Sequence, residues 1–132
     1  AFEAISEAKR LASSTGGRCI ALVVGDGITE IGAGLGAHGA DAVLAADHAA
    51  LALYHGDAFL QVVEAAAKKI DPRAILIPAS INGKDLGARV AARLGGPFVC
   101  DITGLEINDG RITALLLPEQ VLAYIREHRL YL

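Results

Sequence analysis

The sequence has no methionine, no tryptophan and few aromatic residues, which make up 5% of its 132 residues. No run reaches the ~18 apolar residues that a membrane-spanning helix needs, so we expect no membrane partner. Charged residues amount to 20% and hydrophobic ones to 53%, which argues against a disordered chain. A net charge of −3 without a Lys/Arg block also makes nucleic acid an unexpected partner.

Motifs of the common enzyme classes are missing as well. The histidines have no metal-ligand spacing, and the one local group, His48 and His55 with Asp47 and Asp57, is typical of a solvated loop. Neither a G-x-S-x-G nucleophile motif nor a Walker A phosphate loop occurs. The residues alone predict no catalytic centre and no metal site.

The two cysteines, Cys19 and Cys100, lie in or beside apolar runs. A disulfide between them remains open, but buried free thiols in a cytoplasmic domain are the favoured interpretation. The chain opens with an amphipathic segment at residues 1–5 and no signal peptide. Because there is no initiating methionine, we expect a processed N-terminus or missing upstream residues.

Apolar periodicity predicts helices alternating with strands, which is typical of βαβ units, a parallel sheet and helices on both faces. In the expected helix 57–70, Asp57 is the predicted cap and Glu64 pairs with Lys68; in 83–94, Leu94 is expected to point inward. One α/β domain over 1–132 is expected. The expected helices are 2–14, 28–37, 57–70, 83–94 and 118–128, the strands are 18–25, 41–46, 73–78 and 97–101, and a hairpin covers 105–117.

A literal G-x-G-x-x-G occurs at Gly34, Gly36 and Gly39. A dinucleotide site needs a strand before these glycines and a helix after them, whereas here the order is reversed. We therefore favour Gly39 as a helix C-cap over a dinucleotide site.

Two further segments lie where ligands bind in open α/β sheets, at the carboxyl ends of expected strands. The turn Gly25-Asp26-Gly27 follows the first strand, and an acidic side chain there disfavours phosphate, so a tight turn is preferred. Ser80, Asn82 and Gly83 follow the strand 73–78, where a helix cap is the preferred interpretation. A nucleotide-binding site that uses both segments remains the alternative.

Five stretches, taken in order, resemble the N-terminal domain of the electron transfer flavoprotein alpha subunit. They are FEAISEAKRLA with GGRCIALVVGDG, then GADAVL with Asp47, then ALY at 52–54, then NGKDLGARVAARL at 82–94, and CDITGLE at 100–106. The match at 82–94 fits the pattern G-[RK]-[DN]-L-x-x-R-[VL]-A-A-x-L. The resemblance covers about residues 1–113.

This resemblance implies a three-layer, Rossmann-like domain similar to adenine-nucleotide hydrolases, with a mostly parallel sheet. It implies a scaffold that pairs with a beta subunit and serves acyl-CoA-type flavin dehydrogenases through the whole complex, without being an enzyme alone. FAD is expected in the whole protein and not in this chain, because the family's C-terminal FAD-binding domain is absent. The expected location is the cytoplasm, or the mitochondrial matrix in a eukaryote.

Two departures from the family stand out. The tail at 114–132 diverges, and the strand that precedes the first helix in the family, in mid-sheet, is missing. We therefore expect missing upstream residues or a replacement strand from 111–117, from 129–132 or from a second copy. Rival hypotheses are a stand-alone adenine-nucleotide-binding domain and a homodimer formed through residues 119–132.

Overall fold

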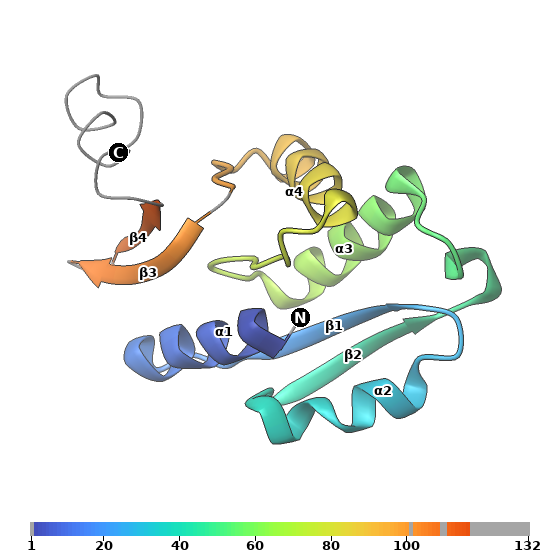
Figure 1. Cartoon of the computed structure of the whole chain (residues 1–132), viewed down its shortest axis with the longest axis horizontal. Helices are drawn as coiled ribbons and strands as arrows, with labels where there is room; N and C mark the ends of the chain where they lie inside the picture. Colours follow the sequence, from blue (N-terminus) through green and yellow to red (C-terminus); the bar gives the residue numbers. More distant parts are fainter. Residues whose placement is uncertain (1, 101, 109–110, 117–132) are drawn as a thin grey trace. The chain divides into compact units, whose positions relative to one another are not determined.

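The computed structural model describes residues 2–100, 102–108 and 111–116, in two compact units within residues 1–98 and 99–132. Among the described helices, none is long and apolar enough to cross a membrane. Along the chain (Figure 1) the elements are α1 (Phe2–Thr15), β1 (Ile20–Gly25), α2 (Thr29–Ala33), the 3₁₀ turn η1 (Leu35–His38), β2 (Ala42–Asp47), the 3₁₀ turn η2 (Ala49–Leu51), α3 (Gly56–Ile70), α4 (Ile81–Leu94), β3 (Ile102–Asn108) and β4 (Arg111–Leu116).

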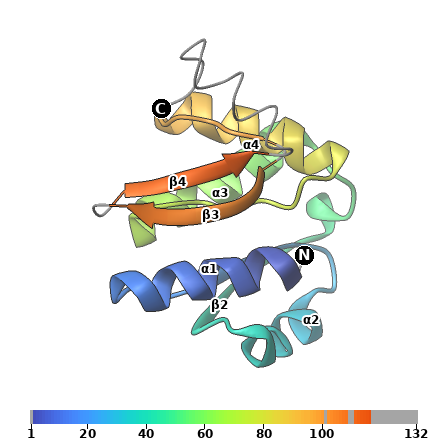
Figure 2. The ribbon, with the colours of Figure 1, turned by 60° about the vertical axis from the view of Figure 1, so that its left-hand side comes forward.

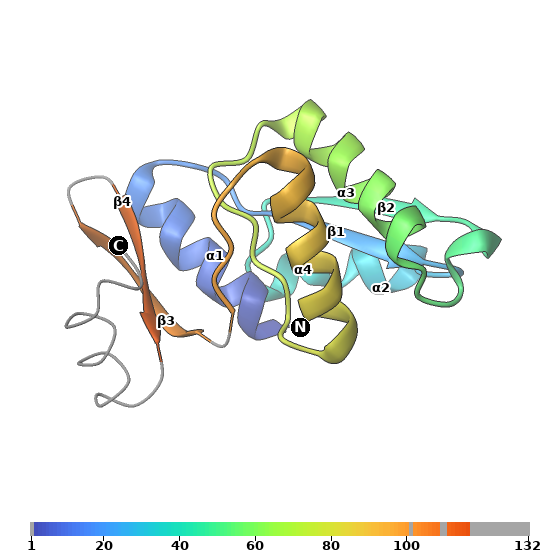
Figure 3. The ribbon, with the colours of Figure 1, turned by 90° about the horizontal axis from the view of Figure 1, so that it is seen from above.

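In the first unit β1 and β2 form a two-stranded parallel sheet, in register from Ile20 opposite Ala42 to Gly25 opposite Asp47. The apolar run IALVVG has no charged residue, as expected for a strand between two helix layers. Helices α2 and α3 lie on opposite sides of this sheet (Figures 1 and 3). The α/β class, the parallel sheet and the helices on both faces are thus confirmed, with two parallel strands.

The core of this unit lies between α3, α4 and β1. Leu60 and Val63 of α3 meet Val90 of α4, and Leu22 of β1 and Leu86 pack against this cluster. Full burial of a side chain such as Leu60, Val63 or Val90 is worth about 1.5–3 kcal/mol. Leu94, expected to point inward, is instead 41% exposed because it ends the helix.

Ion pairs lie on the outer side of helices α3 and α4. Lys68 Nζ lies 3.0 Å from Glu64 Oε1, which confirms the expected pair within α3. Arg93 of α4 reaches the other oxygen of Glu64 at 2.9 Å, an inter-helix contact that periodicity did not predict.

The helix boundaries differ from expectation at two places. Helix α3 begins at Gly56 with His55 as its N-cap residue, so the prediction of Asp57 as the cap is wrong; Asp57 lies in the first turn. The expected helix 28–37 is divided into the five-residue α2 and the turn η1, because its glycines disfavour a continuous helix.

Two expected strands are absent from the described structure. Residues 73–78 and 97–100 are extended or irregular and pair with no strand, although their composition is that of buried strands. A strand requires a hydrogen-bonding neighbour as well as suitable side chains, and neither segment has one in the described part of the chain.

In the second unit β3 and β4 form an antiparallel hairpin, from Asn108 opposite Arg111 to Ile102 opposite Leu116 (Figure 2). This confirms the hairpin, which begins at Ile102, earlier than the expected start at 105. The expected closing helix at 118–128 lies outside the described residues.

Strand β1 lies at an edge of the described sheet. Strand β1 has β2 as its one strand neighbour among the described residues. Of the candidate replacement strands, residues 111–116 form β4, which pairs with β3 in the second unit. The candidate at 129–132 lies outside the described residues.

Both cysteines are free thiols, as expected. Cys19 is buried, and burial, followed by the nearby Asp41 carboxylate, raises the pKa of its thiol. The prediction that Cys100 is buried is wrong, because Cys100 belongs to the unpaired segment before β3 and is exposed.

Candidate functional site: a cavity at the carboxyl end of β1

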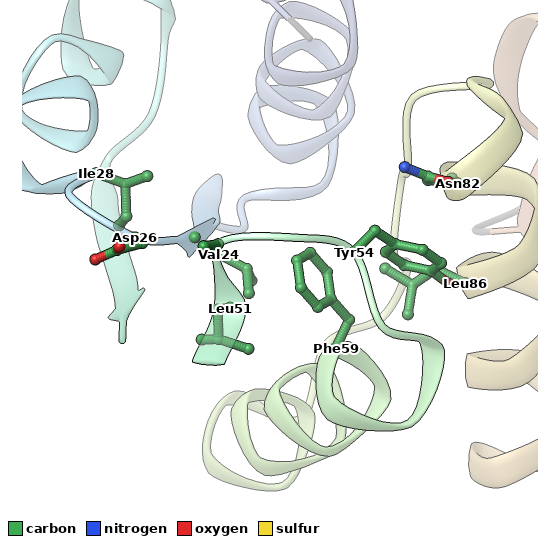
Figure 4. A pocket seen from close by; sticks show the side chains of 11 residues that line it. Val24, Asp26, Ile28, Leu51, Tyr54, Phe59, Asn82 and Leu86 are labelled. Carbon is green, nitrogen blue, oxygen red and sulfur yellow. The ribbon is translucent and has the colours of Figure 1, made fainter. Parts of the chain in front are cut away.

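An open cavity of about 450 Å³ lies at the carboxyl end of β1, between that strand end and the first turn of α4. Figure 4 shows its apolar wall, formed by Val24, Leu51, Phe59 and Leu86. Its volume is within the range of small-molecule sites, and its place is where ligands bind in open α/β sheets. The lining residues are Val24, Gly25, Asp26, Ile28, Leu51, Ala52, Tyr54, Phe59, Asn82, Gly83 and Leu86.

The structure brings together four of the six residues singled out from the sequence: Gly25, Asp26, Asn82 and Gly83 line the cavity. The remaining two, Gly27 and Ser80, do not line it and have structural roles instead. The sequence thus selected residues on both sides of this cavity but did not separate lining residues from turn residues.

The turn after β1 is organised by a carboxylate of the chain itself. Asp47, at the end of β2, accepts hydrogen bonds from Gly27 N at 2.8 Å, Ile28 N at 3.1 Å and Thr29 Oγ1 at 2.9 Å. These bonds, that from Gly27 foremost, lower the pKa of the Asp47 carboxyl below its ordinary value of 3.8. The donors that a phosphate would use are thus already engaged, which supports the interpretation of 25–27 as a tight turn.

The start of α4 is fixed by capping and by close packing. The Ser80 hydroxyl accepts a hydrogen bond from Gly83 N at 3.0 Å, which confirms the predicted cap. A Cβ on Gly83 would overlap the carbonyl oxygen of Pro78 and lie 3.2 Å from Ile77 Cγ2. Glycine is needed here so that the preceding segment can pack against α4.

A polar network missed by the sequence reasoning lies beside the cavity. Tyr54 Oη donates to Asp85 Oδ2 at 2.6 Å, and Arg89 Nε donates to the same oxygen at 3.0 Å. Arg89 also reaches Asp57 Oδ1 at 3.2 Å, which links α4 to the first turn of α3. The spacing of Asp85 and Arg89 is visible in the sequence as an i, i+4 pair, but the long-range partners are not.

This network holds the aromatic wall of the cavity in place. The ring of Tyr54 meets that of Phe59 edge-on, with centroids 5.0 Å apart and planes at 71°. Desolvation, followed by the hydrogen bond to Asp85, raises the pKa of Tyr54, while the Tyr54 hydroxyl and then Arg89 lower the pKa of Asp85. Both groups therefore keep their usual charge at neutral pH and act as positioning groups.

The remaining sequence motifs have structural roles. His48 Nδ1 accepts from Ala50 N at 3.0 Å and so caps η2, while the His55 side chain makes no cap bond. In the described ranges no three His, Cys, Asp or Glu side chains gather as a metal site. Gly39, with φ of 113°, ends η1 and leads into β2, which confirms its role as a C-cap.

The residues around the cavity do not fit the pyrophosphate of FAD. The lining includes no Lys or Arg, its one charged member is the exposed carboxylate of Asp26, and Asp47 engages the neighbouring backbone donors. What the lining does fit is an apolar group that contacts Phe59 and Leu86, with the Asn82 amide and the Asp26 carboxylate at its edge.

Comparison with protein families gives a match that spans nearly the whole chain. Residues 1–130 match the family model described as "Electron transfer flavoprotein domain". This match includes the turn 25–27 and the start of α4, so the cavity lies inside the matched region.

Comparison with individual proteins agrees with this family match. The chain is 36% identical over 121 residues to the "Acryloyl-CoA reductase electron transfer subunit beta" of Anaerotignum propionicum, covering 92% of this chain and 33% of that protein. It is 32% identical over 118 residues to the "Electron transfer flavoprotein subunit alpha" of Thermoanaerobacterium thermosaccharolyticum, covering 89% and 36%. A third, the alpha subunit of Clostridium acetobutylicum, is 34% identical, with 81% and 32% covered. The chain thus spans about a third of the length of these relatives.

Proposed function

Because this chain belongs to the electron transfer flavoprotein family, we propose that it is the N-terminal scaffold domain of an alpha subunit. In this role it binds a beta subunit and supports electron transfer from acyl-CoA-type flavin dehydrogenases in the cytoplasm, without catalysing a reaction alone. The single observation that carries the proposal is the family match over residues 1–130, together with alpha-subunit relatives three times as long.

The roles of the polar residues support a scaffold. Asp47 and Ser80 fix turns, the bond from Tyr54 to Asp85 joins the segment before α3 to α4, and Arg89 joins α4 to Asp57 in the first turn of α3. A catalytic nucleophile or base must be available to a substrate, whereas these side chains form their hydrogen bonds with other parts of the fold.

FAD, where the whole protein binds it, supplies the group that accepts and passes on electrons. We assign it to the remainder of the full-length subunit, since the cavity lacks cationic partners for its pyrophosphate. The isolated chain is therefore expected to purify without flavin absorbance, and FAD added in solution is expected to leave its melting temperature unchanged.

Association with a beta subunit tests the scaffold role directly. The chain is titrated with the purified beta subunit from the same genome by calorimetry, and micromolar binding is expected. A chain that fails to bind it, and whose reading frame encodes no FAD-binding domain, overturns the proposal.

Two exposed apolar side chains are suitable for a point substitution that tests the association with a beta subunit. Leu53 is 82% exposed and Ile81 is 89% exposed, and they adjoin the lining residues Ala52 and Asn82 in sequence. We expect Ile81→Asp to weaken association by about tenfold or more, because apolar anchors dominate interfaces. The matched control is Ala65→Asp, at an exposed position of α3, which is expected to bind normally.

A second candidate function, adenine-nucleotide binding, is favoured by one observation: Gly25, Asp26, Asn82 and Gly83 line one cavity. Calorimetry with adenosine, AMP and ATP tests it. Micromolar affinity that is lost in Asn82→Ala supports the candidate. Because Asp26 and Asp47 disfavour phosphate, adenosine is expected to bind at least as well as ATP if the site is real.

A further inference from the structure

The first turn of α4 contains an exposed Asn-Gly pair. Asn82 and Gly83 are the second and third residues of the helix, Asn82 is exposed, and both residues line the cavity (Figure 4). The backbone nitrogen of Gly83 follows the Asn82 side chain directly, and glycine has no Cβ to shield that nitrogen. The pair is therefore a place where the chain can react with itself.

The reaction open to this pair is deamidation, since asparagine is one of the chemically labile residues. The Gly83 nitrogen gives up its proton and bonds to the side-chain carbonyl carbon of Asn82. The bond from that carbon to the amide nitrogen breaks, and ammonia leaves. Water then opens the resulting succinimide ring at either carbonyl, which leaves aspartate or isoaspartate at position 82. Water is the one co-reactant, and no oxidant or reductant takes part.

Three contacts of the folded chain oppose this reaction. Gly83 N donates its proton to the Ser80 hydroxyl at 3.0 Å, so the proton that must leave is engaged. Lys84 N donates to the Ser80 carbonyl at 2.9 Å, which closes the turn around Gly83. The Pro78 carbonyl packs directly on Gly83, where a Cβ would overlap it. Ring closure also requires a ψ angle at Asn82 outside the helical range, so the turn must open before the reaction can proceed.

A second pair of the same kind, Asp26 with Gly27, provides a comparison. Gly27 N donates to the Asp47 carboxylate at 2.8 Å. A charged acceptor forms a stronger hydrogen bond than a neutral hydroxyl, so the Gly27 nitrogen is held more firmly than the Gly83 nitrogen. The carboxylate of Asp26 is also a poorer target for a nucleophile than an amide. Of these two pairs, Asn82 with Gly83 is therefore the more reactive.

We propose that Asn82 is a site of spontaneous deamidation and that the Ser80 cap sets the rate of this modification. The reaction proceeds from the minor state in which the first turn of α4 is open, and the hydrogen bond from Gly83 to Ser80 keeps that state rare. Ser80 is thus a positioning residue that protects its neighbour chemically, in addition to capping the helix.

The two products change the surroundings of the cavity differently. Aspartate at position 82 places a negative charge in the first turn of α4, where the helix dipole favours it, and brings a second carboxylate to the cavity that Asp26 lines. Isoaspartate lengthens the main chain before Gly83 by a methylene group. Gly83 then cannot keep both its bond to Ser80 and its packing on Pro78, so this product loosens the start of α4.

The test compares the 132-residue chain with a synthetic peptide of residues 78–85, both incubated at mildly alkaline pH. Mass spectrometry of the digested chain measures the loss of the Asn82 amide, and chromatography separates the aspartate and isoaspartate products. We expect the folded chain to react at about a tenth of the peptide's rate or more slowly. Ser80→Ala is expected to raise the rate in the chain about fivefold, the factor that corresponds to one lost capping bond.

Two variants and one internal reference separate the cap from general stability. Ser80→Thr keeps a hydroxyl at the cap and is expected to keep the slow rate. Ala12→Gly destabilises the unit through α1, outside the turn, and is expected to change the rate by less than about twofold. The peptide that contains Asp26 is the reference in every digest, because Asp47 is unchanged in these variants.

Three results overturn the proposal. They are equal rates in the chain and the synthetic peptide, no acceleration in Ser80→Ala, and equal acceleration in Ser80→Ala and Ala12→Gly, which would mean that the rate follows unfolding of the whole unit. None of these measurements depends on association with a beta subunit, so this proposal and the proposed function can fail separately.

Discussion

Replacement of Gly83 by alanine tests whether the start of α4 packs directly against the backbone of Pro78. Alanine is normally the better helix residue by about 1 kcal/mol, so propensity alone predicts stabilisation. The structure predicts the opposite, because the added Cβ would overlap the Pro78 carbonyl oxygen and lie 3.1 Å from its carbon. A backbone carbonyl cannot rotate away as a side chain can, so either α4 or the segment before it must move.

The change in the free energy of unfolding is the sum of two destabilising effects, overpacking and a lost hydrogen bond, and the stabilising gain in helix propensity. Overpacking of this kind costs about 1–3 kcal/mol, towards the upper end where the obstacle is backbone. Displacing Gly83 N also breaks its 3.0 Å bond to Ser80, worth about 1 kcal/mol. We therefore expect Gly83→Ala to lower the free energy of unfolding by about 2–3 kcal/mol, or roughly 8–10 °C in melting temperature.

Urea and thermal unfolding followed by circular dichroism measure this effect, with two alanine controls. Gly36→Ala meets nothing within 4 Å and is expected to be neutral within about 0.5 kcal/mol. Gly87→Ala faces the end of the partly exposed Phe98 ring, which can swing aside, so it is expected to cost less than Gly83→Ala. The reasoning is refuted if Gly83→Ala is as stable as Gly36→Ala.

Three further outcomes are expected. Ser80→Ala lowers the free energy of unfolding by about 1 kcal/mol in chemical denaturation, and a neutral result would mean that the cap bond is not formed in solution. In an NMR titration the pKa of the Asp47 carboxyl is expected below 3.8, and it is expected to rise in Thr29→Ala, which removes one of its hydrogen bonds. Because the pKa is lower in the folded state, the ionised Asp47 stabilises the fold fully at neutral pH, and this stabilisation is lost as the pH falls below 3.8. With a chromogenic disulfide, Cys100 reacts quickly and Cys19 slowly in the folded chain, and equal rates would contradict the assigned burial.

Much of the first unit could be predicted from the sequence because its elements carry local signals. The apolar run of β1 and the periodicities of α1, α3 and α4 each lie within one segment, and all four elements are present. The segment 73–78 has the same kind of apolar run as β1 yet forms no strand. What separates the two is a neighbour to pair with, and no local pattern contains that information.

The candidate site was partly predictable for the same reason. The rule that ligands bind at strand ends selected Gly25, Asp26, Asn82 and Gly83, which do line one cavity. The bond from Tyr54 to Asp85 joins residues 31 positions apart, and the bonds of Asp47 to the turn span 18–20 positions. Contacts of that range depend on the packed fold, so residue type and spacing alone did not find them.

The carboxylate of Asp47 also has a consequence for how the domain responds to solutes. It is an anion tethered by the chain itself, so a dissolved phosphate or nucleotide would have to displace an intramolecular partner before it could bind at the 27–29 turn. The turn therefore forms when the chain folds, and its conformation does not depend on the concentration of dissolved anions. The turn thus keeps the same geometry whether the surrounding solution is rich or poor in phosphate.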